Sequence, residues 1–130
     1  MLFRSRLISG SGTILNIDDD EMILAAVRPV LRKLGYRVLE ARTGEEAVAI
    51  VQSDVDIDVV LLNISLPDIR GDQLYPMLIK ARPGLKVILS SGYGMDTPVK
   101  EVLAAGAQDF IHKPYKLAAL SVKIRKVMDK

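Results

Sequence analysis

The stretch Val-Val-Leu-Leu-Asn-Ile-Ser-Leu-Pro at residues 59–67 decides the fold. Its apolar run ends abruptly in the carboxamide of Asn63, and a loop containing Pro67 follows. A short run with so little polar interruption is typical of a strand buried on both faces, as the strands of parallel sheets are. Ligands of open parallel sheets bind beyond the carboxyl ends of the strands. Asn63 therefore stands where a functional side chain is expected.

Other apolar runs alternate with segments of helical period along the rest of the chain. Strands are predicted at residues 13–17, 36–41, 57–62, 85–90 and 107–112. Helices are predicted at 21–34, after a capping-box sequence at 43–46, at 72–82, at 97–106 and from 117 onward. Alternation of this kind predicts an α/β protein, a doubly wound five-stranded parallel sheet with helices on both faces.

Two prolines disturb the helical patterns. Pro29 lies in the middle of the first helix, where proline costs about 3 kcal/mol. The apolar period continues through it, so the sequence predicts a kinked helix. Pro76 is expected in or near the first turn of the third helix, where proline is tolerated.

Composition excludes several classes of protein. A chain of 130 residues suits one domain, and a net charge of +2 is too small to indicate nucleic acid binding. The absence of cysteine excludes disulfides and thiol chemistry, and a single histidine cannot form a histidine metal cluster. No apolar run approaches the roughly 18 residues of a membrane span. We expect a cytoplasmic protein, or a segment of a larger one, with a flexible linker at 1–12 and one domain at 13–130.

The predicted strands end in side chains that suit one kind of chemistry. Asp18 and Asp19 follow the first strand, Asn63 ends the third, Ser91 follows the fourth, and Lys113 follows the fifth. These ends lie side by side in a doubly wound sheet. Carboxylate and carbonyl oxygens suit Mg²⁺, whereas a hydroxyl and an ammonium group suit the oxygens of a phosphoryl group.

With these side chains in this order at the ends of its strands, the sequence resembles the receiver domain of two-component response regulators. The matching segments are 13–21, 58–67, 87–94, 104–107 and 110–115, and the resemblance covers residues 13–128. The segments Ser-Ser-Gly-Tyr-Gly at 90–94 and Lys-Pro-Tyr at 113–115 are most similar to receivers attached to hybrid histidine kinases. The resemblance implies a flavodoxin-like (βα)₅ fold.

The resemblance also implies a metal site. Asp19 matches the carboxylate that binds Mg²⁺ directly, Asp18 matches its neighbour, which acts through metal-bound water, and the Ser65 carbonyl matches a third ligand. Asn63 stands where the family carries its phosphoacceptor aspartate. A carboxylate can form an acyl phosphate, whereas a neutral carboxamide cannot. The Asn63 carbonyl oxygen can still bind a cation, and the missing charge costs at most about 4 kcal/mol, so weakened Mg²⁺ binding is expected.

The remaining roles concern the phosphoryl group and the response to it. Ser91 matches the hydroxyl that bonds the phosphoryl group, Lys113 matches the ammonium that pairs with it, and Phe110 takes the place of an aromatic switch residue. Lys113-Pro114 is a candidate cis peptide. Receivers are not enzymes beyond their own phosphotransfer and dephosphorylation, and Asn63 is expected to abolish both.

The implied partners are a histidine kinase or phosphotransfer protein and a fused kinase module. A homodimer is also implied, through the face formed by helix 97–106, strand 107–112 and the last helix. We expect neither nucleic acid binding nor a membrane span.

Several alternatives stay open. Asn63 is either an engineered block or a natural variant. The chain is a phosphorelay receiver, a pseudo-receiver that binds partners without phosphorylation, or a small Mg²⁺-dependent phosphohydrolase. The phosphohydrolase needs Asp18 as nucleophile and Asp20 as acid. It is disfavoured because there is no cap-like insertion and Asp20 is expected to point into a helix start.

Overall fold

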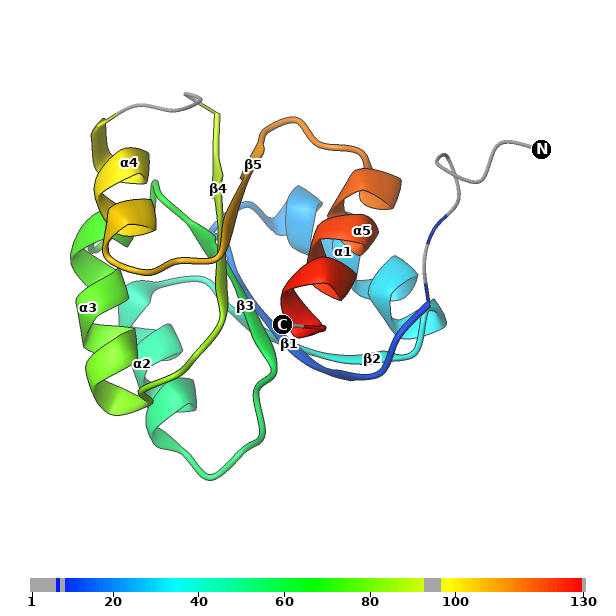
Figure 1. The fold of residues 1–130 in the computed structure, drawn as a ribbon, viewed down its shortest axis with the longest axis horizontal. Coiled ribbons are helices and arrows are strands. Elements are labelled where there is room, and N and C mark those ends of the chain that lie inside the picture. Colours follow the sequence, from blue (N-terminus) through cyan, green and yellow to red (C-terminus); the bar gives the residue numbers. More distant parts are fainter. Residues whose placement is uncertain (1–6, 8, 93–96, 130) are drawn as a thin grey trace.

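Five parallel strands form a single sheet at the centre of the molecule (Figure 1). The computed structural model describes residues 7, 9–92 and 97–129. The strand order is β2-β1-β3-β4-β5. The strands are β1 Gly12–Ile17, β2 Tyr36–Ala41, β3 Val59–Asn63, β4 Val87–Ser91 and β5 Asp109–His112.

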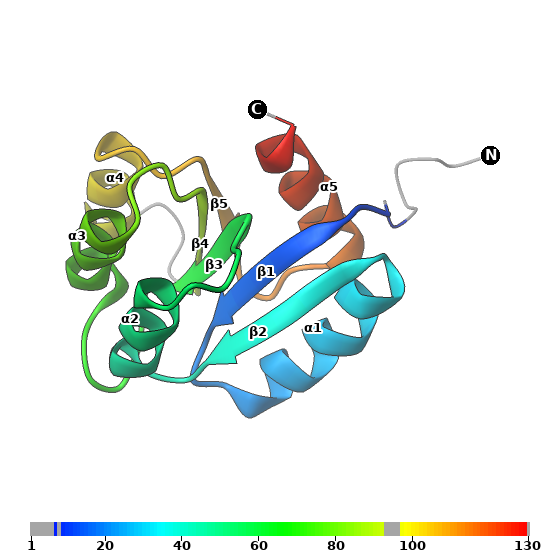
Figure 2. The ribbon, with the colours of Figure 1, turned by 90° about the horizontal axis from the view of Figure 1, so that it is seen from below.

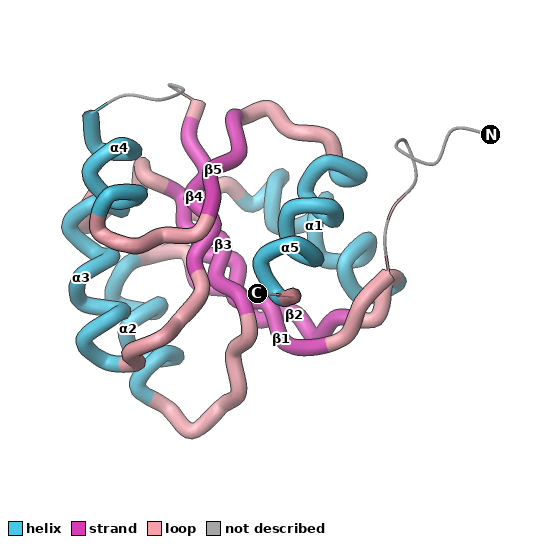
Figure 3. Tube along the Cα trace, in the orientation of Figure 1, coloured by secondary structure: helices cyan, strands magenta, loops and turns pink. Residues whose placement is uncertain are grey.

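Helices cover both faces of the sheet, as Figure 2 shows from below and Figure 3 shows by element type. The helices are α1 Glu21–Lys33, α2 Gly44–Gln52, α3 Gly71–Ala81, α4 Thr97–Ala104 and α5 Leu117–Met128. Helices α1 and α5 lie on one face, and α2, α3 and α4 lie on the other. The predicted doubly wound, flavodoxin-like α/β fold is confirmed. None of the helices in the described part of the chain is long and apolar enough to cross a membrane.

Each face of the sheet carries its own core, because successive side chains of a strand point to opposite faces. Leu15 and Ile17 of β1 belong to the cluster under α2, α3 and α4, whereas Ile14 belongs to the cluster under α1 and α5. All five residues of β3 are buried. This two-sided burial is the reason that β3 reads as an uninterrupted apolar run in the sequence.

Three strands begin two residues later than predicted, at Val59, Val87 and Asp109. Leu85 and Ala107 are buried, but their N–H groups bond to turn and helix carbonyls, those of Arg82 and Val102. Burial alone does not distinguish such residues from the first residues of a strand. Strands predicted from the hydrophobic pattern therefore begin too early in the sequence.

The helix termini follow the capping signals closely. The side chain of Asp20 accepts a hydrogen bond from the Met22 N–H and caps α1, which continues through Pro29. Helix α3 begins at Gly71, which places Pro76 just beyond the first turn. The capping box before α2 is half formed, because Thr43 accepts from the Glu46 N–H while Glu46 accepts from the Arg42 N–H.

The N-terminal boundary differs slightly from the expected one. Strand β1 begins at Gly12, and the N–H of Gly10 donates to the Leu34 carbonyl at 2.9 Å. Residues 1–6 and 8 of the predicted linker lie outside the described residues.

Candidate functional site

The carboxyl ends of β1, β3 and β5 bring three polar side chains together. Asp18 follows β1, Asn63 ends β3 and Lys113 follows β5. The Lys113 Nζ lies 2.8 Å from Asp18 Oδ2 and 3.1 Å from Asn63 Oδ1. The structure therefore brings together side chains that are separated by up to 95 residues in the sequence.

The carboxamide of Asn63 is the centre of this cluster. Its Nδ2 donates to the Ser65 carbonyl at 2.6 Å and lies 3.3 Å from Asp19 Oδ1 and 3.5 Å from Asp18 Oδ1. Its Oδ1 faces the ammonium group of Lys113. Only acceptors lie on one side of the amide and a donor lies on the other, so the partners define which atom is nitrogen and which is oxygen.

Asp18 is the most deeply placed charge of the cluster, with 1% of its surface exposed. It forms an ion pair with Lys113, and its Oδ1 accepts from the Asp20 N–H at 3.0 Å. The carboxylate of Asp20 is exposed and is engaged with the start of α1. The expected engagement of Asp20 with the helix start is confirmed, and it disfavours the phosphohydrolase alternative, which needs Asp20 as its acid.

The donor set for a divalent cation consists of the carboxylates of Asp18 and Asp19 and the carbonyl of Ser65. In the described segments, no group of three or more His, Cys, Asp or Glu side chains is placed to hold a metal. The Asn63 oxygen that was expected to face the cation bonds to Lys113 instead, and an N–H donor faces the three oxygens. As arranged, these residues do not fit a bound Mg²⁺.

The other predicted site residues lie on or just after β4 and β5, on one side of β3 in the sheet. Ser91 is the last residue of β4 and is buried, and its carbonyl accepts from the Lys113 N–H at 2.8 Å. Phe110 of β5 is half-buried against the core under α2, α3 and α4, and its ring lies 6.5 Å from that of His112. The Lys113-Pro114 peptide is cis, as expected. Residues 93 and 94 of the predicted loop lie outside the described residues.

Two residues between β3 and the first turn of α3, Asp68 and Gly71, make structural contacts that the sequence did not indicate. Asp68 accepts from the N–H groups of Gly44 and Glu45, at 2.9 and 3.1 Å, and so caps α2 from another loop. These backbone bonds hold the pKa of Asp68 below its usual value. The N–H of Gly71 donates to the Ile64 carbonyl at 2.7 Å, and a Cβ there would lie 2.8 Å from the Asn63 carbonyl oxygen. Nothing in the local sequence indicates either contact.

A mostly apolar groove adjoins the cluster between α1 and the segment after β5. Its lining includes Met22, Val27, Lys113 and Tyr115. Burial, with a smaller contribution from the charge of Asp18, raises the pKa of Tyr115 to about 12. The phenol therefore remains neutral beside the acidic cluster.

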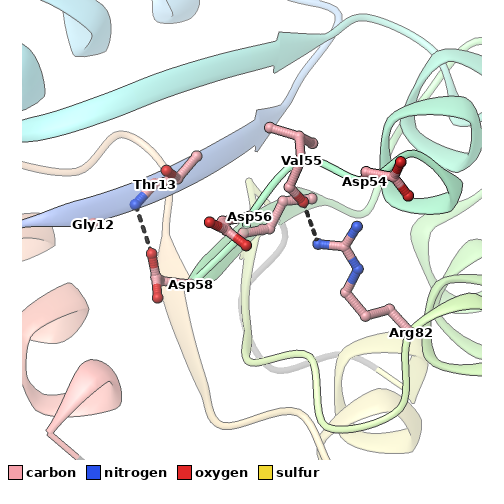
Figure 4. Close-up of a pocket in the computed structure, with 8 residues that line it drawn as sticks. Gly12, Thr13, Asp54, Val55, Asp56, Asp58 and Arg82 are labelled. Carbon is pink, nitrogen blue, oxygen red and sulfur yellow. Dashed lines mark hydrogen bonds between the residues drawn. The ribbon is translucent and has the colours of Figure 1, made fainter.

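A second hollow lies at the amino ends of β1 and β3, opposite the Asn63 cluster (Figure 4). Asp58 accepts from the Thr13 N–H at 2.7 Å, and Arg82 donates to the Val55 and Ser53 carbonyls, each at 2.7 Å. These bonds join β1, the turn before β3 and the end of α3. We interpret them as bracing of the fold.

The model of the response regulator receiver domain matches residues 14–125, and the chain belongs to this family. It is 30% identical over 124 residues to the sensor kinase CckA of Brucella abortus, covering 95% of this chain and 13% of the kinase. It is 31% identical to the chemotaxis protein CheY of Thermotoga maritima, covering 88% of this chain and 95% of CheY.

A similar solved structure is a CheY-like receiver domain protein from Methanospirillum hungatei, with a TM-score of 0.86 and 34% identity. The alignment covers 92% of this chain and 95% of that one. Family membership makes this chain a receiver domain of two-component signalling. Receiver domains bind Mg²⁺, interact with histidine kinases or phosphotransfer proteins, and are generally not enzymes beyond their own phosphotransfer.

Proposed function

We propose that this chain is a phosphorelay receiver in which Asn63 occupies the phosphoacceptor position, so that the domain receives no phosphoryl group. The observation that carries the proposal is the place of Asn63 at the end of β3, within 3.5 Å of Asp18, Asp19, the Ser65 carbonyl and Lys113. An aspartate here would sit between acidic oxygens and an ammonium group, as phosphotransfer requires.

Each neighbouring residue has a role in this proposal. Asp18, Asp19 and the Ser65 carbonyl form the acidic side, where a divalent cation binds weakly at best because of Asn63. Lys113 and Ser91 form the side that would contact a phosphoryl group, and Lys113 already bonds the residue 63 side chain. A carboxamide in place of the nucleophilic carboxylate leaves the surrounding residues in place, but it cannot form the acyl phosphate.

The output of the domain is proposed to pass through the α4-β5-α5 face, which also serves homodimerisation. Phe110 lies on β5 and contacts the core under α4, so its position depends on both elements. If the α4-β5-α5 face has two conformations, a partner that binds one conformation more tightly shifts the equilibrium toward it, and this shift regulates the domain. The proposed partners are a histidine kinase, a phosphotransfer protein or a fused kinase module in the cytoplasm.

The proposal is tested with the variant Asn63→Asp, Mg²⁺ and a small-molecule phosphodonor. The variant should gain one phosphoryl group, whereas the unsubstituted chain, with Asn63, should gain none. The matched control is Asn63→Asp with Lys113→Met, which should be phosphorylated slowly or not at all. An Asn63→Asp protein that is folded but never phosphorylated would contradict the phosphotransfer origin of this site.

One observation favours a second candidate, a pseudo-receiver that binds its partner independently of phosphorylation. Both polar atoms of the Asn63 carboxamide have hydrogen-bond partners within the chain. A site whose polar atoms all have hydrogen-bond partners within the chain is suited to keeping the domain in one conformation. This candidate predicts that partner affinity is unchanged by Mg²⁺ and beryllofluoride and by Asn63→Asp. An affinity that required an acidic residue 63 would exclude it.

A further inference from the structure

We propose that the side-chain amide group of Asn63 substitutes for the divalent cation of the site, so that this domain completes its acidic cluster without metal. The inference deepens the proposed function and rests on it only for the comparison with receivers that carry aspartate at this position. The inference concerns the hydrogen bonds that the Asn63 nitrogen donates to the acidic oxygens. The proposed function concerns the phosphotransfer that is lost because residue 63 is not a carboxylate.

The geometry places one nitrogen where three oxygens converge. The Asn63 Nδ2 contacts the Ser65 carbonyl at 2.6 Å, Asp19 Oδ1 at 3.3 Å and Asp18 Oδ1 at 3.5 Å. These oxygens come from the loop after β1 and the loop after β3. In receivers that carry aspartate at this position, the matching residues would hold a cation, Asp19 and the Ser65 carbonyl directly and Asp18 through metal-bound water. The Asn63 amide offers the three oxygens two hydrogens, so it gives partly positive atoms to these acceptors, of which Asp18 Oδ1 also accepts from the Asp20 N–H.

Reversing the amide does not restore a cation site. If the carboxamide rotated by half a turn, its oxygen would face the acidic side, but its nitrogen would then face Lys113 Nζ at the present separation of 3.1 Å. Two donors would meet, and Lys113 would lose one of its two acceptors. Lys113 therefore holds the Asn63 nitrogen toward the acidic side.

The charges of the cluster support the same conclusion. Asp18 and Asp19 contribute two negative charges, and Lys113 contributes one positive charge through its ion pair with Asp18. Asp18 is buried whereas Asp19 is exposed to solvent, so the charge without an ion-pair partner in the cluster is the hydrated one. An aspartate at 63 would add a further buried charge and would demand a cation. Asparagine at this position removes that demand.

The direct test is NMR spectroscopy of the unsubstituted chain, with Asn63 in place, in the presence of Mn²⁺. The chain has two asparagines, Asn16 and Asn63, so the Asn63 side-chain amide pair is readily assigned. We expect a pair that exchanges slowly with water, is unmoved by millimolar Mg²⁺ and is not selectively broadened by Mn²⁺. Saturable broadening centred on Asn63, Asp19 and Ser65 would overturn the inference.

A second measurement uses thermal unfolding with and without Mg²⁺. Asn63→Asp should bind Mg²⁺ at least about tenfold more tightly than the unsubstituted chain and should gain thermal stability from it. Asn63→Asp combined with Asp19→Asn is the matched control, in which most of that gain should disappear. Equal stabilisation of the unsubstituted chain by Mg²⁺ would contradict the substitution of the cation by the amide.

The two proposals fail separately. Specific Mn²⁺ broadening in the unsubstituted chain, with Asn63→Asp accepting phosphate, would overturn only the role of the amide. An inert Asn63→Asp protein, with an unsubstituted chain that ignores Mn²⁺, would overturn only the phosphoacceptor assignment. The NMR experiment needs no substituted protein, so it stands even if a variant does not fold.

Discussion

The Nζ of Lys113 lies 3.1 Å from Oδ1 of Asn63, across 50 residues of sequence. This bond fixes the direction of the Asn63 amide and therefore decides which atom faces Asp18, Asp19 and the Ser65 carbonyl. An ammonium group tolerates only an acceptor at that distance. The orientation of the residue at the phosphoacceptor position thus depends on a residue from the opposite half of the chain.

Lys113→Met should convert the site to one that responds to metal. Without the ammonium group, the Asn63 amide can rotate and present its oxygen to the acidic side, and the two carboxylates lose their compensating charge. We expect reduced thermal stability that millimolar Mg²⁺ partly restores, measured by thermal unfolding. A variant as indifferent to Mg²⁺ as the unsubstituted chain would show that Lys113 does not set the orientation.

Asp18→Asn should destabilise the fold by about 2–4 kcal/mol. The substitution leaves the largely buried Lys113 without its ion-pair partner, and breaking a buried pair from one side is costly. The Lys113 side chain is 17% exposed and retains Asn63 Oδ1, which limits the loss. The matched control is Asp129→Asn, whose exposed pair with Arg125 should contribute less than about 1 kcal/mol in urea unfolding. Equal losses would contradict the buried pair.

Gly71→Ala should disturb the start of α3 and the end of β3 together. The added Cβ would lie 2.8 Å from the Asn63 carbonyl oxygen and 2.8 Å from Ile64 Cα, both of them backbone atoms. Overpacking of this kind costs about 1–3 kcal/mol. Gly92→Ala is the control, because an added Cβ meets nothing within 4 Å there. If urea unfolding gave the same small change for both variants, the close approach at Gly71 would be refuted.

Asp68 should make the stability of the domain depend on pH. Its pKa is lowered in the folded state by hydrogen bonds from the Gly44 and Glu45 N–H groups. Its contribution is therefore fully present above the unfolded-state pKa of about 3.9 and is lost as the pH falls through the lower folded-state value. Asp68→Asn should lose stability at neutral pH, and the difference should vanish in strong acid. The control is the exposed Asp56→Asn, and a pH-independent difference for Asp68→Asn would contradict this mechanism.

The fold was predictable because β3 and its neighbours are buried on both sides. The run at 59–63 and the alternation of strands with helices indicated a parallel sheet, and the polar residues at the ends of four strands indicated one functional edge. The beginnings of β4 and β5 were not predictable, because Leu85 and Ala107 are buried without pairing in the sheet. The hydrophobic pattern of a sequence indicates which residues are buried. Only the hydrogen bonds distinguish a buried residue that pairs in the sheet from a buried residue that precedes the strand.

The arrangement inside the site was only partly predictable. Sequence placed Asp18, Asn63 and Lys113 at one edge, but the direction of the Asn63 amide depends on a tertiary contact with Lys113. The Asn63 oxygen as a ligand for a cation therefore stays a prediction, and in this structure that oxygen bonds to Lys113. The capping of α2 by Asp68 was missed because its two partners lie more than 20 residues away.

The most direct test of the central claim is to locate the phosphoryl group in Asn63→Asp. The protein would be exposed to phosphoramidate and Mg²⁺, reduced with borohydride to trap the acyl phosphate, and mapped by tandem mass spectrometry beside the unsubstituted chain. We expect modification at position 63 alone in the variant and none in the chain that retains Asn63. Modification at Asp18 or Asp19 instead, or equal labelling of the unsubstituted chain, would contradict the phosphoacceptor assignment.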